Sequence, residues 1–206
     1  MTTDKIRGAA VAAVAALALG GTAAAEPMID SVHFLIPGGA GGGWDGTARG
    51  TGEALTKAGI VGDASYENMS GGGGGKAIAH LIEIDDPEIL MVNSTPIVIR
   101  SLQGVFPQSF RDLTMVAGTI GDYAALVVNS DSPIDSFGDL LETYQADPTN
   151  VAIGGGSVAG GMDHLVAALI MKAAGENPLA VKYIPYDAGG KAMAGLLSGE
   201  IKALST

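Results

Sequence analysis

The stretch IPGGAGGGWDGTARG, residues 36–50, decides how the chain folds around it. It follows an apolar run, residues 32–36, that has the length of a buried strand, and six of the nine residues 38–46 are glycine. From Trp44 onward, small and apolar residues recur at helical spacing. Glycine lets backbone N–H groups approach a ligand closely, and a helix N-terminus adds a partial positive charge. The stretch therefore predicts a strand–loop–helix junction that can hold a small anion.

The same arrangement recurs along the chain. Glycine clusters at residues 71–75 and 154–161 also lie between an apolar run and a helical pattern. Strands are predicted at residues 32–36, 64–69, 89–92, 115–117, 124–129, 151–153, 181–184 and 201–204. Helices are predicted at residues 44–58, 76–83, from 95, from 136, 162–174 and 187–198. Such alternation is typical of an α/β fold with parallel sheets and helices on both faces, in which ligands bind beyond the carboxyl ends of the strands.

The first 25 residues have the pattern of a secretory signal peptide. Lys5 and Arg7 give a basic start, an apolar run of 11 residues follows, and three alanines precede Glu26. The run is shorter than the ~20 apolar residues that a membrane span needs. Cleavage is expected between Ala25 and Glu26. The chain has no cysteine, which excludes a disulfide framework and a lipid-anchored cysteine, so we expect a periplasmic protein.

The charge balance excludes one class of partner. Eleven basic and 22 acidic residues give a formal net charge of −11, which repels nucleic acid. An anionic ligand is repelled at long range too, so its site must be built locally. His33, His80 and His164 show no metal-ligand spacing with acids or with one another, and we expect neither a metal nor a cofactor.

A dinucleotide-binding module is one alternative. Gly41, Gly43 and Gly46 satisfy G-x-G-x-x-G, and Glu67 lies 21 residues beyond Gly46. The match is weak in a chain with 32 glycines, and export argues against it. The segment SGGGGGKA, residues 70–77, imitates a phosphate-binding loop but lacks the hydroxyl residue that should follow its lysine.

A secreted α/β hydrolase of the esterase type is the other alternative. GGSVA, residues 155–159, resembles the nucleophile elbow around Ser157, except that Ala159 replaces the last glycine. His164 lies seven residues on, in the same predicted helix, so no triad is visible in the sequence. We therefore expect a binding protein and not an enzyme.

Several candidate residues have two interpretations. Trp44 can cover a ligand or pack between helix and sheet. Asp45 can cap its helix or pair with Arg49, or it can orient the glycine loop. Thr95, Ser157 and Asp187 each lie at a predicted helix start, where their side chains can cap the helix or contact a ligand.

Five stretches together resemble one protein family. They are IPGGAGGGWDGTARG, ENMSGGGGGKA, NSTP, GGGSVAGGMDHL and YIPYDAGGKAMAGLLSGE. In this order they resemble the periplasmic substrate-binding proteins of tripartite tricarboxylate transporters, the Bug family. The GGGWD form is similar to the tricarboxylate-type branch. The resemblance covers nearly all of the chain after residue 25.

The resemblance implies two hinged lobes of the type II periplasmic binding protein class, here residues 26–126 and 127–206 after the signal peptide 1–25. It implies a monomer that closes on a small di- or tricarboxylate and delivers it to membrane permease subunits. Family members continue past the equivalent of Thr206, so we expect the second lobe to be incomplete and the chain to be truncated at its C-terminus. The ligand-binding residues that the resemblance implies are Gly39, Ala40, Gly41, Trp44, Asp45, Thr95, Ser157, Gly160, His164 and Asp187.

Overall fold

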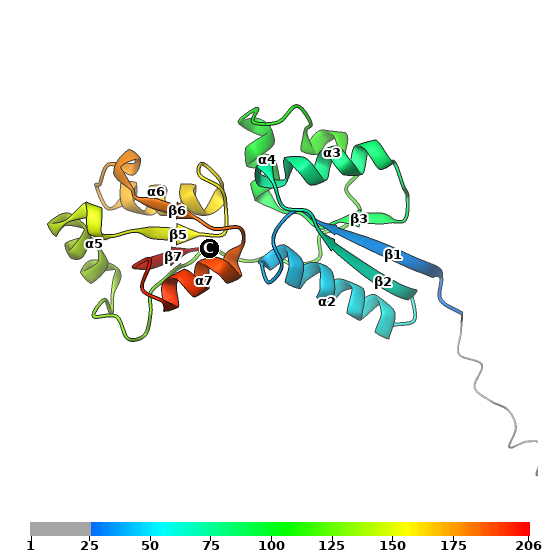
Figure 1. The fold of residues 1–206 in the computed structure, drawn as a ribbon, viewed down its shortest axis with the longest axis horizontal. Helices are drawn as coiled ribbons and strands as arrows, with labels where there is room; N and C mark the ends of the chain where they lie inside the picture. Colours follow the sequence, from blue (N-terminus) through cyan, green and yellow to red (C-terminus); the bar gives the residue numbers. More distant parts are fainter. Residues whose placement is uncertain (1–25) are drawn as a thin grey trace, which may run out of the picture.

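The computed structural model describes residues 26–206, which form two α/β lobes side by side (Figure 1). The predicted signal peptide lies outside the described residues. Between residues 26 and 206, no helix has the length and hydrophobicity needed to cross a membrane.

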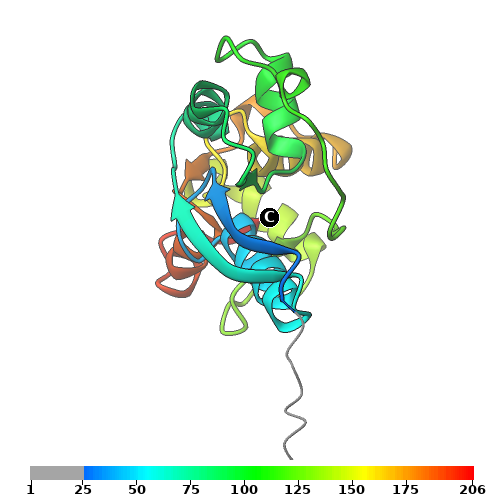
Figure 2. The ribbon, with the colours of Figure 1, turned by 90° about the vertical axis from the view of Figure 1, so that its right-hand side faces the viewer.

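Lobe 1 is built on a parallel sheet with the strand order β2-β1-β3. The helix α2 covers one face, and α3 and α4 lie on the other, as Figures 1 and 2 both show. Phe34 and Ile36 of the central strand pack with Ala48 of α2 in a buried core. The elements of lobe 1 are β1 (Ile29–Ile36), α2 (Gly43–Lys57), β2 (Val61–Asn68), η1 (Gly72–Gly74), α3 (Gly75–Ile84), β3 (Ile89–Met91), α4 (Thr95–Leu102) and η2 (Phe110–Asp112).

Lobe 2 repeats this strand order and adds a strand. Its sheet runs β4-β7-β5-β6, in which β5, β6 and β7 are parallel and β4 is antiparallel to β7. The elements of lobe 2 are β4 (Leu126–Val127), α5 (Phe137–Ala146), η3 (Pro148–Asn150), β5 (Ile153–Gly155), α6 (Met162–Ala173), η4 (Pro178–Ala180), β6 (Tyr183–Pro185), α7 (Gly189–Leu197) and β7 (Ala203–Ser205).

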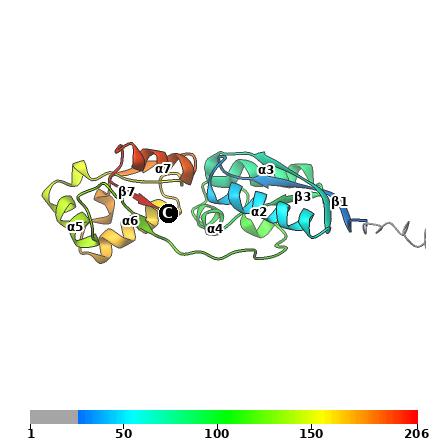
Figure 3. The same cartoon turned by 90° about the horizontal axis from the view of Figure 1, so that it is seen from below.

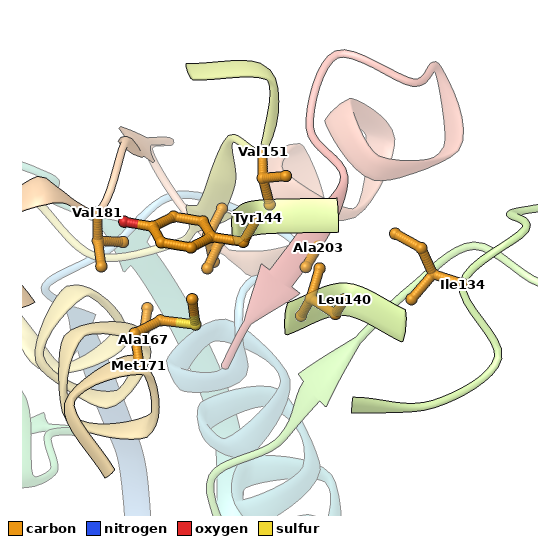
Figure 4. Packing of buried hydrophobic residues seen from close by; sticks show 9 residues of the cluster. Ile134, Leu140, Tyr144, Val151, Ala167, Met171, Val181 and Ala203 are labelled. Carbon is orange, nitrogen blue, oxygen red and sulfur yellow. The ribbon is translucent and has the colours of Figure 1, made fainter. Parts of the chain in front are cut away.

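Two apolar clusters cover the sheet of lobe 2. On one face, Leu140 and Tyr144 of α5 meet Met171 of α6 around the sheet, as the close view in Figure 4 shows. The other cluster joins Ala192 and Leu196 of α7 to residues of the sheet and its flanks. Burial of these side chains from both helical layers is what holds lobe 2 together.

The connection between the lobes differs from the sequence-based prediction. The predicted strand at residues 115–117 is wrong: these residues lie in an extended segment that runs along the lobes (Figure 3). Met115 and Val116 are 60% and 77% exposed and pair with no strand. The strand predicted at 124–129 shrinks to β4, and the predicted lobe boundary after residue 126 falls inside it. An apolar run becomes a strand only where a neighbouring strand supplies hydrogen bonds.

Candidate functional site

Five helices of the described chain begin at strand ends that face the opposite lobe: α2, α3 and α4 of lobe 1, and α6 and α7 of lobe 2. Figure 1 shows the starts of α2 and α7 meeting between the lobes. The N-cap residues make no side-chain capping bond in any of the five; they are Gly42, Gly74, Ser94, Gly161 and Ala188. By contrast α5, away from this region, is capped by the Ser136 side chain. The N-cap side chains thus leave the first N–H groups of these helices unbound, although in α6 the N–H of Asp163 donates to Ser157 Oγ at 3.4 Å.

Asp45 fixes the glycine loop that precedes α2 in lobe 1, residues 38–43, here called the first glycine loop. Its Oδ2 accepts the N–H of Gly41 at 3.0 Å, and its Oδ1 accepts Nε–H of Arg49 at 3.0 Å. Gly41 has φ +78°, a conformation that favours glycine. The hydrogen bond from Arg49, followed by that from Gly41, lowers the pKa of the Asp45 carboxyl. Asp45 is only 6% exposed, so it both pairs with Arg49 and orients the loop.

The first loop also touches lobe 2. A side chain at Gly39 would collide with the backbone carbonyl oxygen of Asp187, and a Cβ at Gly42 would lie 3.0 Å from the Cβ of Ala188. Ala40, between the two glycines, is exposed. Only a bare backbone allows the lobes to approach this closely.

Trp44 links two helix starts within lobe 1. Its indole Nε1–H donates to Ser94 Oγ at 2.8 Å, and its ring packs against the lobe 1 core. Ser94 stands at the N-cap of α4, but its hydroxyl binds Trp44 instead of capping the helix. Thr95, the first residue of α4, is exposed next to it. Trp44 therefore holds the starts of α2 and α4 together.

His164 fixes the glycine loop that precedes α6 in lobe 2, residues 154–161, here called the second glycine loop. The N–H of Gly160, at φ +77°, donates to Nδ1 of His164 at 2.9 Å. The imidazole stacks on Tyr183 at 4.6 Å, and the Tyr183 hydroxyl donates to the carbonyl oxygen of Ser157 at 2.8 Å. Burial is the largest cause that raises the pKa of Tyr183. Within residues 26–206 the Ser157 hydroxyl makes no hydrogen bond to a histidine, so no catalytic triad forms there.

Asp187 links the lobes at a third point. The hydroxyl of Ser70, from lobe 1, donates to Asp187 Oδ1, and Lys191 lies 3.2 Å from Oδ2. The Ser70 hydrogen bond is the largest cause that lowers the pKa of Asp187. The N-cap of α7 is Ala188, so Asp187 does not cap that helix. Ala188 has φ +151°, which is strained for a residue other than glycine and marks this turn as constrained.

The structure adds contact residues that the sequence does not single out. Arg100 near the end of α4 and Gln103 at its C-cap reach the second glycine loop of lobe 2, residues 154–161. Ser70 reaches Asp187 across 117 residues of chain. Nothing local distinguishes these three residues, because their partners become neighbours only when the lobes come together.

Two other features of the described residues lie apart from this region. Among residues 26–206, no group of three or more His, Cys, Asp or Glu side chains could hold a metal ion. A mainly apolar cavity of about 820 Å³ lies along α2, between this helix and Thr119 and Ile120. None of the ten candidate residues lines this cavity.

The fold and the site define a class: two α/β lobes whose helix starts face each other across a junction, as in a binding protein. The sequence model for "Tripartite tricarboxylate transporter family receptor" (TctC) matches residues 67–206. The chain therefore belongs to the TctC receptor family, and its fold is that of the two-lobed periplasmic binding proteins with parallel-type sheets. No match was found among curated proteins.

Solved structures are similar in fold at low sequence identity. One, described as a periplasmic transporter, has a TM-score of 0.73 and 21% identity over 85% of this chain and 59% of its own. MatC from Rhodopseudomonas palustris with bound malate has a TM-score of 0.67 and 18% identity, over 86% and 60%. R. palustris Rpa4515 with adipate has a TM-score of 0.63 and 19% identity, over 86% and 58%. The present chain thus spans less than two thirds of the length of these proteins.

Proposed function

We propose that the chain is a periplasmic solute-binding protein, exported by cleavage after Ala25, that captures a small di- or tricarboxylate between its lobes. As a monomer it would present this ligand to the permease subunits of a tripartite tricarboxylate transporter. The observation that carries the proposal is the set of helix starts whose N-cap residues make no side-chain capping bond, contributed by both lobes to one junction. Membership of the TctC family supports it.

Backbone amides supply the attraction that the net charge does not. The chain is acidic overall, so a carboxylate gains little from long-range steering. At short range, each helix start offers N–H groups and about half a positive elementary charge. Two of the structurally similar proteins are described with malate or adipate, and both ligands are dicarboxylates. A ligand with a carboxylate at each end suits a junction with helix starts on both sides.

The candidate residues divide into two roles under this proposal. Gly39 and Ala40 offer backbone, and the Thr95 and Ser157 hydroxyls offer hydrogen bonds to ligand oxygens. The others hold the loops and helix starts in place around the ligand; they are Gly41, Trp44, Asp45, Gly160, His164 and Asp187. Because the ligand would touch both lobes, it would stabilise the closed arrangement over the open one.

Thermal melting tests the proposal. The chain is heated with malate, adipate, citrate, inorganic phosphate or NAD, each at increasing concentration. A ligand that binds only the folded form stabilises it by about 2.7 kcal/mol at a hundred times its Kd. We expect a rise in Tm with one or more of the carboxylates and none with NAD. A rise with NAD alone, or ester hydrolysis that disappears in Ser157→Ala, would contradict the proposal.

A further inference from the structure

A second contact between the lobes joins α4 to the loop before α6. Gln103 Nε2 donates to the carbonyl oxygen of Gly160 at 3.0 Å. Arg100 Nη1 lies 3.4 Å from the carbonyl oxygen of Ala159, a longer and weaker contact. The link between Ser70 and Asp187 is separate, because it joins the loop after β2 to the loop after β6.

Arg100 sets the direction of the Gln103 amide. Arg100 Nη1 also donates to Gln103 Oε1 at 2.9 Å. A guanidinium can only donate, so it must face the amide oxygen. The amide NH₂ is then turned toward the carbonyl of Gly160, which can only accept. The two side chains therefore act as one unit in which Arg100 positions Gln103.

The surroundings of Arg100 hold its side chain at the junction. A Cβ at Gly73 would lie 3.1 Å from Arg100 Nε and 3.3 Å from Cγ2 of Val158, so the arginine packs between loops of both lobes. Its Nε is buried and has no hydrogen-bond partner. Among the described residues, no carboxylate forms an ion pair with it. Arg100 is thus not committed to an acid within its own lobe.

The loop of lobe 2 is held from both sides at one residue. The N–H of Gly160 is bound by His164 within lobe 2, while the carbonyl of Gly160 is bound by Gln103 from lobe 1. We propose that Arg100 and Gln103 form a latch that closes lobe 1 onto this loop and thereby slows ligand release. The role in ligand release rests on the proposed function, whereas closure itself can be measured without a ligand.

Spin labels can report closure because the chain has no cysteine of its own. Glu83→Cys on α3 and Glu142→Cys on α5 place one label on an exposed site of each lobe. The distance distribution is measured by pulsed electron spin resonance in the absence of any carboxylate. The decisive variant is Gln103→Glu, which keeps the shape and the bond from Arg100 but replaces the NH₂ donor by an acceptor. Gln108→Glu, in the same lobe, makes the same charge change and is the control.

We expect Gln103→Glu to shift molecules to longer distances, with the ratio of closed to open molecules falling about two- to tenfold, the range of one hydrogen bond. Arg100→Met, which keeps the aliphatic stem, should lower the ratio of closed to open molecules as well. Arg111→Met is its control and should leave this ratio unchanged. If a carboxylate binds, its dissociation should be faster in both latch variants. Unchanged distances in Gln103→Glu and Arg100→Met, or a wild type without a closed component, would overturn the latch. If the distances shift but no carboxylate binds, the latch stands and the proposed function fails.

Discussion

The glycine loops of the two lobes have the same backbone design but different side-chain chemistry. Gly41 and Gly160 both have a φ near +78°, at +78° and +77°, and each is followed by a glycine N-cap in extended conformation. In each loop the glycine N–H is bound by the side chain four residues later. That side chain is Asp45 in lobe 1 and His164 in lobe 2.

The difference lies in what supports the acceptor. Asp45 is an anion near a helix start and is paired with Arg49, so charge stabilises the first loop. His164 accepts through an unprotonated ring nitrogen and is held by stacking on Tyr183. The comparison teaches that the same loop geometry, with a glycine at positive φ, can be held by an acceptor four residues on, and that either a carboxylate or an imidazole can be this acceptor.

The largest effect should come from removing the charged acceptor. Asp45→Ala leaves the N–H of Gly41 without its partner and Arg49 without its ion pair, so we expect a loss of about 1.5–3 kcal/mol in the free energy of unfolding. Urea denaturation measures it. Asp45→Asn keeps an acceptor for Gly41 and should lose less. Equal losses in both variants would mean that the charge, and not the acceptor, fixes the loop.

A smaller effect is expected from the neutral acceptor of lobe 2. His164→Phe keeps an aromatic ring against Tyr183 but removes Nδ1, so the free energy of unfolding should fall by about 0.5–1.5 kcal/mol. Amide hydrogen exchange measured by NMR should become faster at Gly160 and stay unchanged at Gly41. If exchange at Gly160 does not change, His164 only packs under the loop and the parallel between the lobes fails.

The smallest effect concerns the pH dependence of the free energy of unfolding. The contributions of Asp163 and Asp45 to it have opposite signs. Desolvation raises the pKa of Asp163, next to His164, against hydrogen bonds from Ser157. A raised pKa means that Asp163 favours folding below its ordinary value of 3.8, and that this contribution is lost as the pH rises through the raised value. The lowered pKa of Asp45 has the opposite sign, so its contribution is lost as the pH falls through that lowered value.

Asp163→Asn should therefore raise Tm at pH 7, by a gain of about 1 kcal/mol or less, and should lose this advantage toward pH 3. Thermal melting across this range measures the change. Asp63→Asn, on the exposed surface of β2, is the control and should follow the wild type at both ends. A lower Tm of Asp163→Asn at pH 7 would show that the hydrogen bonds to the carboxylate outweigh its desolvation.

The sequence predicts those parts of the molecule that are decided locally. The three glycine junctions lie between strand and helix as predicted, because glycine content and apolar spacing are local signals. The capping interpretations of Asp45 and Asp187 are wrong, since the N-caps are Gly42 and Ala188. The latch also stays hidden in the sequence. Its partners are 57 residues apart or more, and only the contact of two finished lobes brings them together.

The missing side-chain caps have a consequence for how such a protein diverges. A substitution changes a side chain and leaves the peptide N–H in place, unless the new residue is proline. Under the proposed function, an alanine scan over the helix starts would therefore leave most of the N–H groups that bind the ligand in place, whereas a proline scan would remove them. If the proposed function holds, relatives can differ widely in the side chains of these loops and still keep the backbone N–H groups that would anchor a carboxylate.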